Sequence, residues 1–166
     1  MDMTHLFLLL LTRLALKQAP AQDCQSMTLA KLRTLYQAAN RANSLLTEGF
    51  ALPVLKADYS MVYHRCRKSV GYPDTLQPIS LPELVQVQER QRRIGFTTYD
   101  RTTYLSIQYN AQQAYQVLSS LKRQAALYSR GYTDGQTAYL FDSVSVNNGR
   151  GVTQFRIALM PLAQLR

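Results

Sequence analysis

Apolar and polar residues alternate at helical spacing in two stretches of the chain. Across residues 26–48, apolar residues recur at three- and four-residue steps, and polar residues fill the positions between them. This pattern predicts one amphipathic helix, which Ser26 or Thr28 would cap and which Gly49 would end in a left-handed turn. A second helix is predicted over residues 110–126, where a capping-box arrangement stands at the start and apolar residues line one face.

The other periodic segments favour strands. Aromatic and β-branched residues, or a two-residue alternation, predict strands over residues 50–55, 59–66, 84–93, 94–99, 102–109, 127–133, 136–146 and 152–160. The richness of residues 84–93 in Gln and Glu also suits a helix, and we assign the strand on the alternation of Val85 and Val87. Hairpin turns are predicted at Asp100-Arg101 and Asp134-Gly135. A loop is predicted over residues 69–82, which contain Gly71, Pro73, Pro78 and Pro82.

This order of elements predicts an α+β domain. Two helices packed on one face of an antiparallel sheet would bury both apolar stripes. Around residues 46–58 and 121–134 the chain passes from a helix end through a strand to an Asp-containing turn. The repeated order suggests two related αββ-type halves.

The N-terminus has the layout of a secretory signal. An apolar run at residues 6–11 is followed by Ala19-Pro20-Ala21, the small residues that a signal peptidase reads. We therefore expect a signal peptide at 1–21, a single mature domain at 22–166, and a secreted or periplasmic location. Because Arg13 and Lys17 follow the run instead of preceding it, a retained anchor or an ordinary helix of a cytoplasmic protein stays open. The run is shorter than the roughly 20 apolar residues that span a bilayer, so we expect no transmembrane segment after cleavage.

Two cysteines, Cys24 and Cys66, lie in the mature part. In an oxidising compartment an even pair predicts one disulfide, whereas two free thiols would be expected in the cytoplasm. No Cys/His spacing typical of a metal site occurs, and no cofactor motif is present, so we expect neither a metal nor a cofactor.

The chain is strongly basic, with 19 Lys and Arg against 10 Asp and Glu. Such a charge attracts anionic partners. Two clusters are the predicted contact surface for an anionic partner or a component of the cell envelope: Arg65, Arg67 and Lys68, and Arg90, Arg92 and Arg93. Arginine beside tyrosine also suits single-stranded nucleic acid, but secretion and the lack of an RNA-binding motif argue against that partner.

Residues for catalysis are few. His64 is the only histidine after residue 21, and the sequence contains no nucleophile elbow, zinc-protease motif or phosphate-binding glycine loop. The carboxylates are scattered mainly over turns, where they serve local backbone hydrogen bonding. The sequence therefore predicts a non-catalytic binding or interaction module with a basic surface and an unidentified ligand. A hydrolase that uses dispersed carboxylates and a cytoplasmic nucleic-acid-binding domain are the alternatives.

Three further motifs stand beside the predicted elements: Leu-Thr-Glu-Gly-Phe at residues 46–50, Tyr-Leu-Ser-Ile at residues 104–107, and Asn148-Gly149-Arg150 before the last strand. With them the chain resembles small secreted bacterial proteins of unknown function that are built of tandem helix–strand–strand units. The resemblance covers most of the mature chain and implies the same compartment and fold class. It implies no catalytic residue.

Overall fold

The structure, a computed structural model, describes residues 25–70, 79–118, 128–146 and 152–165, and only the backbone of residues 66–70, 79 and 80. These residues form three α-helices and one eight-stranded antiparallel sheet, so the predicted α+β class is confirmed. The helices are α2 (Leu29–Gln37), α3 (Arg41–Thr47) and α4 (Arg101–Ala114). The strands are β1 (Val54–Leu55), β2 (Met61–Val70), β3 (Ile79–Gln88), β4 (Arg93–Thr98), β5 (Gln116–Val117), β6 (Arg130–Thr133), β7 (Thr137–Val146) and β8 (Val152–Pro161).

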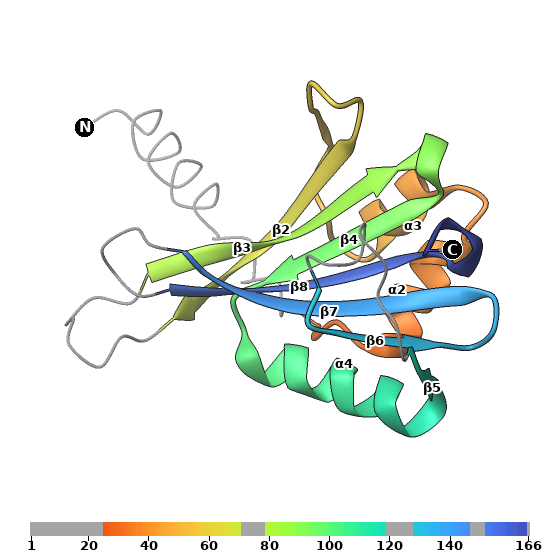
Figure 1. Cartoon of the computed structure of the whole chain (residues 1–166). Helices are drawn as coiled ribbons and strands as arrows, with labels where there is room; N and C mark the ends of the chain where they lie inside the picture. Colours follow the sequence, from red (N-terminus) through yellow and green to blue (C-terminus); the bar gives the residue numbers. More distant parts are fainter. Residues whose placement is uncertain (1–24, 71–78, 119–127, 147–151, 166) are drawn as a thin grey trace, which may run out of the picture.

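The long strands form the middle of the sheet. The order across it is β1-β2-β3-β4-β8-β7-β6-β5, so β4 and β8 are neighbours although more than fifty residues separate them in the chain. Both edges are two-residue strands. Figure 1 shows the sheet with α4 below it, and the hairpin that joins β1 to β2 (gold) projecting beyond its far end.

The predicted single helix over residues 26–48 is two helices. Thr28 caps α2, as predicted, by accepting a hydrogen bond from the backbone N of Lys31. The helix ends because Ala38 adopts an extended conformation, and the side chain of Asn40 then caps α3 by accepting from the backbone N of Asn43. Gly49 has a φ of 84° after α3, so its predicted left-handed turn is confirmed.

The predicted hairpin over residues 94–109 is wrong in its second half. Residues 102–109 belong to α4, and Asp100 is the N-cap of that helix instead of a turn residue. One Asp100 carboxylate oxygen accepts from the backbone N of Thr102 and the other from the hydroxyl of Thr103. Buried residues of α4 lie at helical spacing: Thr103, Tyr104, Ile107 and Ala111.

The second predicted helix is wrong in its position. Residues 110–114 close α4, residues 116–117 form β5, and residues 119–126 lie outside the described residues. The predicted strand over residues 50–55 is shorter than expected, since only the two residues of β1 pair with β2. The strand at residues 84–88 and the hairpin turn at Asp134-Gly135 are confirmed. Within the predicted loop at residues 69–82, the described residues belong to β2 and β3.

Alternate positions of the strands separate an apolar from a polar side. The strand side chains on one side of the sheet pack with the buried side chains of α2, α3 and α4 and form the main core. These strand residues are Tyr63 of β2, Val85 and Val87 of β3, Ile94 and Phe96 of β4, Phe155, Ile157 and Leu159 of β8, and Tyr139 and Phe141 of β7. Several of the intervening positions carry polar, partly exposed side chains: Gln86 and Gln88 of β3, Arg93 and Thr97 of β4, and Gln154 and Arg156 of β8. A second, smaller cluster on these intervening positions of β7 and β8 comprises Ala138, Leu140, Ala158 and Met160, against which Leu118, Tyr128, Leu162 and Leu165 pack. We call this second side of the sheet the polar face.

Candidate functional site

Arg65 does not belong to a contact surface, contrary to the prediction. Its side chain is directed into the domain and only 5% of the residue is exposed. The guanidinium forms an ion pair with Glu83 of β3 at 3.1 Å and donates to the backbone oxygens of Glu48 and Gln25. It also lies 4.7 Å from the centre of the Phe50 ring. Arg65 therefore ties the segment before α2, the end of α3 and two strands together.

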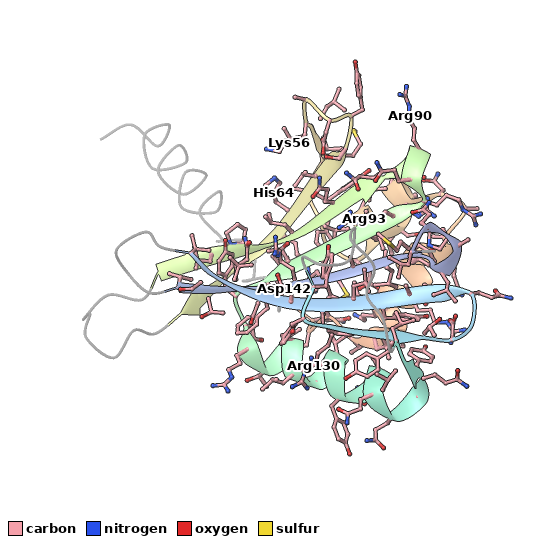
Figure 2. All side chains as sticks on the ribbon, viewed as in Figure 1. Lys56, His64, Arg90, Arg93, Arg130 and Asp142 are labelled. Atoms are coloured by element: carbon pink, nitrogen blue, oxygen red, sulfur yellow. The ribbon has the colours of Figure 1, made fainter. Side chains whose placement is uncertain are left out.

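The other five predicted residues lie in three separate places. Arg67 and Lys68 are in β2, where the structure describes the backbone alone. Arg90 and Arg92 are exposed at the turn between β3 and β4. Arg93, the first residue of β4, is half-buried on the polar face. Figure 2 shows Arg90 at one end of the sheet and Arg93 nearer its middle.

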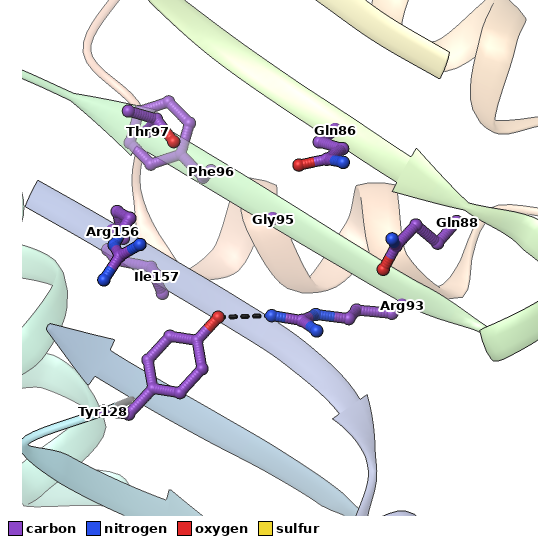
Figure 3. A pocket seen from close by; sticks show the side chains of 9 residues that line it. All are labelled: Gln86, Gln88, Arg93, Gly95, Phe96, Thr97, Tyr128, Arg156 and Ile157. Carbon is purple, nitrogen blue, oxygen red and sulfur yellow. Dashed lines mark hydrogen bonds between the residues drawn. The ribbon is translucent and has the colours of Figure 1, made fainter. Parts of the chain in front are cut away.

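A cleft on the polar face holds the candidate site. It encloses about 460 Å³, open solvent included, and its lining comes from the three central strands and from the segment before β6. The polar lining residues are Gln86 and Gln88 of β3, Arg93 and Thr97 of β4, Arg156 of β8, and Tyr128 (Figure 3). Sequence reasoning found only Arg93 among them.

Gly95 leaves the middle of this cleft open. Its neighbours Ile94 and Phe96 are buried in the main core, so the Gly95 position faces the cleft. A Cβ atom at Gly95 would lie 3.9 Å from the backbone oxygen of Gln86, an ordinary contact distance. The backbone therefore does not require glycine here, and the missing side chain creates space between Arg93 and Arg156 (Figure 3). A glycine inside a strand pattern is the signal that could have located the site from sequence.

Tyr128 fixes the position of Arg93. A terminal nitrogen of the guanidinium donates to the Tyr128 hydroxyl, and the guanidinium carbon lies 5.8 Å from the centre of the ring. Among the described residues, no other hydrogen bond engages the Arg93 guanidinium, and the group carries a permanent positive charge.

Arg156 has a donor that lacks a partner. Arg156 of β8 lies directly opposite Asp142 of β7, and its Nη2 atom forms an ion pair with the Asp142 carboxylate. The Nε atom is buried, and no acceptor for it occurs among the described residues. A buried donor without an acceptor costs about 1–3 kcal/mol. An anion in the cleft that accepts from Nε would remove this cost.

The carboxylates of the described residues have structural partners. Glu48 pairs with Lys31, Glu83 with Arg65, Glu89 with Arg41, and Asp142 with Arg156. Asp58, Asp100 and Asp134 accept hydrogen bonds within their own turns or caps. Hydrogen bonds from the Ser60 hydroxyl and backbone N lower the pKa of Asp58. His64 lies half-buried in β2 on the polar face, at a position that pairs with Leu84.

Two predicted features fall outside the described part of the chain. They are the signal segment at residues 1–21 and the disulfide, since Cys24 and the side chain of Cys66 are not among the described residues. No helix among the described residues is long and apolar enough to cross a membrane. In the same residues, no three His, Cys, Asp or Glu side chains come together as a metal site would need.

Comparison with known proteins gives no relative. No family model, no curated protein and no solved structure matches the chain. The resemblance to small secreted bacterial proteins stays a prediction, and we infer the function from the geometry of the polar face.

Proposed function

We propose that the protein is a secreted or periplasmic, non-catalytic binding module whose cleft on the polar face receives an anionic group of its partner. The observation that carries this proposal is the buried, unpartnered Nε of Arg156 at a cleft that Arg93 also lines. Two guanidinium groups offer several donors to one carboxylate or phosphate. The amides of Gln86 and Gln88 add neutral donors beside them.

The strand order supports a site between two related halves. In each half a helical segment precedes four strands: α2 and α3 precede β1–β4, and α4 precedes β5–β8. The halves would meet where β4 pairs with β8, and Arg93 and Gly95 come from the first strand while Arg156 comes from the second. Both halves would then contribute residues to one cleft.

Binding is a better account of the polar face than hydrolysis. A two-carboxylate hydrolase needs one carboxyl group that can donate a proton and a second that acts as a base or nucleophile. The acid beside the cleft is Asp142, and its ion pair with Arg156 engages it. The cleft therefore offers donors to a ligand and no pair of free acids.

The export proposal comes from the apolar run at residues 6–11 and the small residues that follow it. Recovery of the chain cleaved after Ala21 from the culture medium or periplasm would support it. Full-length protein in the cytoplasm would contradict it without affecting the cleft.

NMR of the arginine Nε–Hε groups tests the cleft. Inorganic phosphate and a glutamate-rich peptide are titrated separately, because they distinguish a phosphate-bearing from a carboxylate-bearing partner. We expect the Arg156 and Arg93 signals to shift with at least one probe and the signal of Arg101, which is exposed at the start of α4, to stay in place. Equal shifts at all three arginines, or none at Arg156, would overturn the proposal. Added salt should weaken the effect, since it screens partly exposed charges.

A further inference from the structure

A second surface lies outside the cleft, at residues 52–59. Four large apolar side chains of this segment are exposed: Leu52 (76%), Val54 (51%), Leu55 (62%) and Tyr59 (72%). Eight large apolar side chains are exposed in the described part of the chain, so half of them lie within these eight residues. Single exposed apolar residues are ordinary, but a group of this kind marks an interaction site. We call residues 52–59 the apolar hairpin; it includes β1 and projects from the sheet (Figure 1).

Hydrogen bonds hold the apolar hairpin in one conformation. The backbone N of Lys56 donates to the oxygen of Ser60 at 2.9 Å, and the N of Tyr59 donates to the oxygen of Lys56 at the same distance. The Asp58 carboxylate accepts from the backbone N and the hydroxyl of Ser60, which is fully buried. The hairpin therefore displays its apolar side chains on a fixed backbone, with little entropy left to lose on binding.

Tyr59 occupies the left-handed position that closes the turn of the hairpin. Its φ is 61°, in the left-handed region that a bulky residue rarely occupies. Burial does not compensate for this strain, because most of the ring is exposed. The guanidinium of Arg90 lies 5.4 Å from the centre of the ring. Strain of this kind concentrates at functional positions.

Cations flank the apolar side chains. Lys56 and Arg90 are both exposed, and Figure 2 shows them at the same end of the molecule. Asp58 is the single acidic residue of the hairpin, and its carboxylate is engaged by Ser60 and lies 3.4 Å from the side-chain amides of Gln86 and Gln88. The apolar hairpin and its neighbour Arg90 thus expose aliphatic side chains, a tyrosine and two positive charges.

We propose that the apolar hairpin inserts into the surface of a bilayer that contains anionic lipids. Leu52, Val54 and Leu55 would enter the boundary between headgroups and acyl chains, as apolar faces of membrane-surface segments do. Tyrosine prefers this interface, and long cationic side chains reach from it to lipid phosphates. The charge match is with anionic headgroups, because Lys56, Arg90 and the net charge of +9 are all positive.

Tryptophan fluorescence tests insertion at the hairpin itself. The chain contains no tryptophan, so a Leu55→Trp variant carries a single one. The vesicles are pure phosphatidylcholine or an equal mixture with phosphatidylglycerol. We expect a blue shift of the emission with the mixed vesicles only, and no shift for a Leu105→Trp variant, whose residue is exposed on α4. This readout separates the hairpin from any binding by the apolar run at residues 6–11. An unshifted Leu55→Trp spectrum would overturn the proposal.

Sedimentation with the same vesicles gives the second measurement. Leu52→Ser/Leu55→Ser should lower the partition of the full chain into mixed vesicles by about tenfold or more, given the apolar area that the two leucines would bury. Lys56→Gln/Arg90→Gln should lower it severalfold and remove its salt dependence. The matched control Leu105→Ser/Tyr109→Ser removes two exposed apolar residues from α4 and should leave it unchanged. Equal losses in the control and the hairpin variant would contradict a specific role for the hairpin. If the hairpin contacts a protein instead, both hairpin variants will match wild type.

Discussion

Asp142 of β7 and Arg156 of β8 face each other directly in the sheet and form an ion pair beside the cleft. The pair uses a terminal nitrogen of Arg156 and leaves Nε buried without an acceptor among the described residues. Asp142 thus holds Arg156 in place and also competes with a bound anion for its charge. This double role gives the cleft a simple electrostatic test.

Asp142→Asn should strengthen anion binding. The amide keeps the size of the side chain and removes the negative charge next to the ligand, so we expect about a three- to tenfold gain in affinity for the phosphate or peptide probe. Isothermal titration calorimetry measures it. Glu89→Gln is the control, because Glu89 pairs with Arg41 outside the cleft. A loss of affinity in Asp142→Asn would mean that Asp142 acts mainly by orienting Arg156.

Gly95→Val should close the cleft without unfolding the protein. The added Cβ atom meets its nearest neighbour at 3.9 Å, and valine suits a strand. We expect the melting temperature to stay within a few degrees of wild type, since no buried group is lost, and probe binding to fall about tenfold or more. Circular dichroism and calorimetry check the two parts. Undiminished binding in a folded Gly95→Val protein would show that the ligand does not occupy the space above Gly95.

Removal of one partner of the Arg65–Glu83 pair should destabilise the domain strongly. Both side chains are 2% exposed, so Arg65→Met removes a buried ion pair together with the hydrogen bonds of Arg65 to the backbone oxygens of Glu48 and Gln25. The expected loss is about 3–5 kcal/mol in the free energy of unfolding. Urea denaturation measures it, with Arg90→Met as the exposed control. A loss no greater than that of the control would return Arg65 to the candidate surface residues.

The sequence predicted features that local chemistry determines. Gly49 ends a helix, Asp134-Gly135 turns a hairpin, and the last strand alternates, each through interactions of residues close in the chain. Residues 102–109 were misassigned because Leu105 and Ile107 also fit a two-residue alternation. Tyr104, Ile107 and Ala111 fit a helical periodicity of three to four residues, and their packing in the main core favours the helix over the strand.

The site could not be predicted in the same way. Gly95 and Arg156 are far apart in the sequence, and only the pairing of β4 with β8 brings them to one cleft. The cluster of charges around Arg65 misled the prediction because the sequence does not show that β2 pairs with β3, where Glu83 neutralises that arginine. Charge counts locate cations along a chain, whereas long-range strand pairing determines which of them remain free.

Asp134 should make the β6–β7 hairpin sensitive to acid. Burial raises the pKa of Asp134, but hydrogen bonds from the backbone N of Thr137 and Gln136 and from the Tyr139 hydroxyl outweigh it, so the folded-state pKa lies below the ordinary 3.8. The stabilisation is therefore present above the pKa of the unfolded chain and is lost as the pH falls through the lower, folded-state value. Thermal melts at falling pH should show a steeper loss for wild type than for Asp134→Asn. Parallel curves for the two proteins would contradict this role of Asp134.

The Cys24–Cys66 disulfide stays a prediction, because Cys24 and the side chain of Cys66 lie outside the described residues. The backbone oxygen of Gln25 accepts a hydrogen bond from Arg65 at 3.0 Å, so the chain next to Cys24 lies against a side chain next to Cys66. Cys66 also stands at the register shift of β2, between Arg65 and Arg67. The bond would close a long loop in the unfolded chain, which stabilises a domain by roughly 4 kcal/mol in the chain-entropy account.

Intact mass spectrometry of protein from an oxidising compartment tests this bond. Without reductant the mass should be lower than the reduced mass by two hydrogen atoms, and thiol alkylation should leave the unreduced protein unmodified. Cys24→Ser should abolish the difference and lower the melting temperature, because it removes the cross-link and retains Arg65 and its hydrogen bonds. A Cys24→Ser/Cys66→Ser variant serves as the control, since it has no free thiol and should be as unstable as the single variant. Alkylation of both cysteines in folded, unreduced wild-type protein would exclude the bond and favour a reducing compartment for the chain.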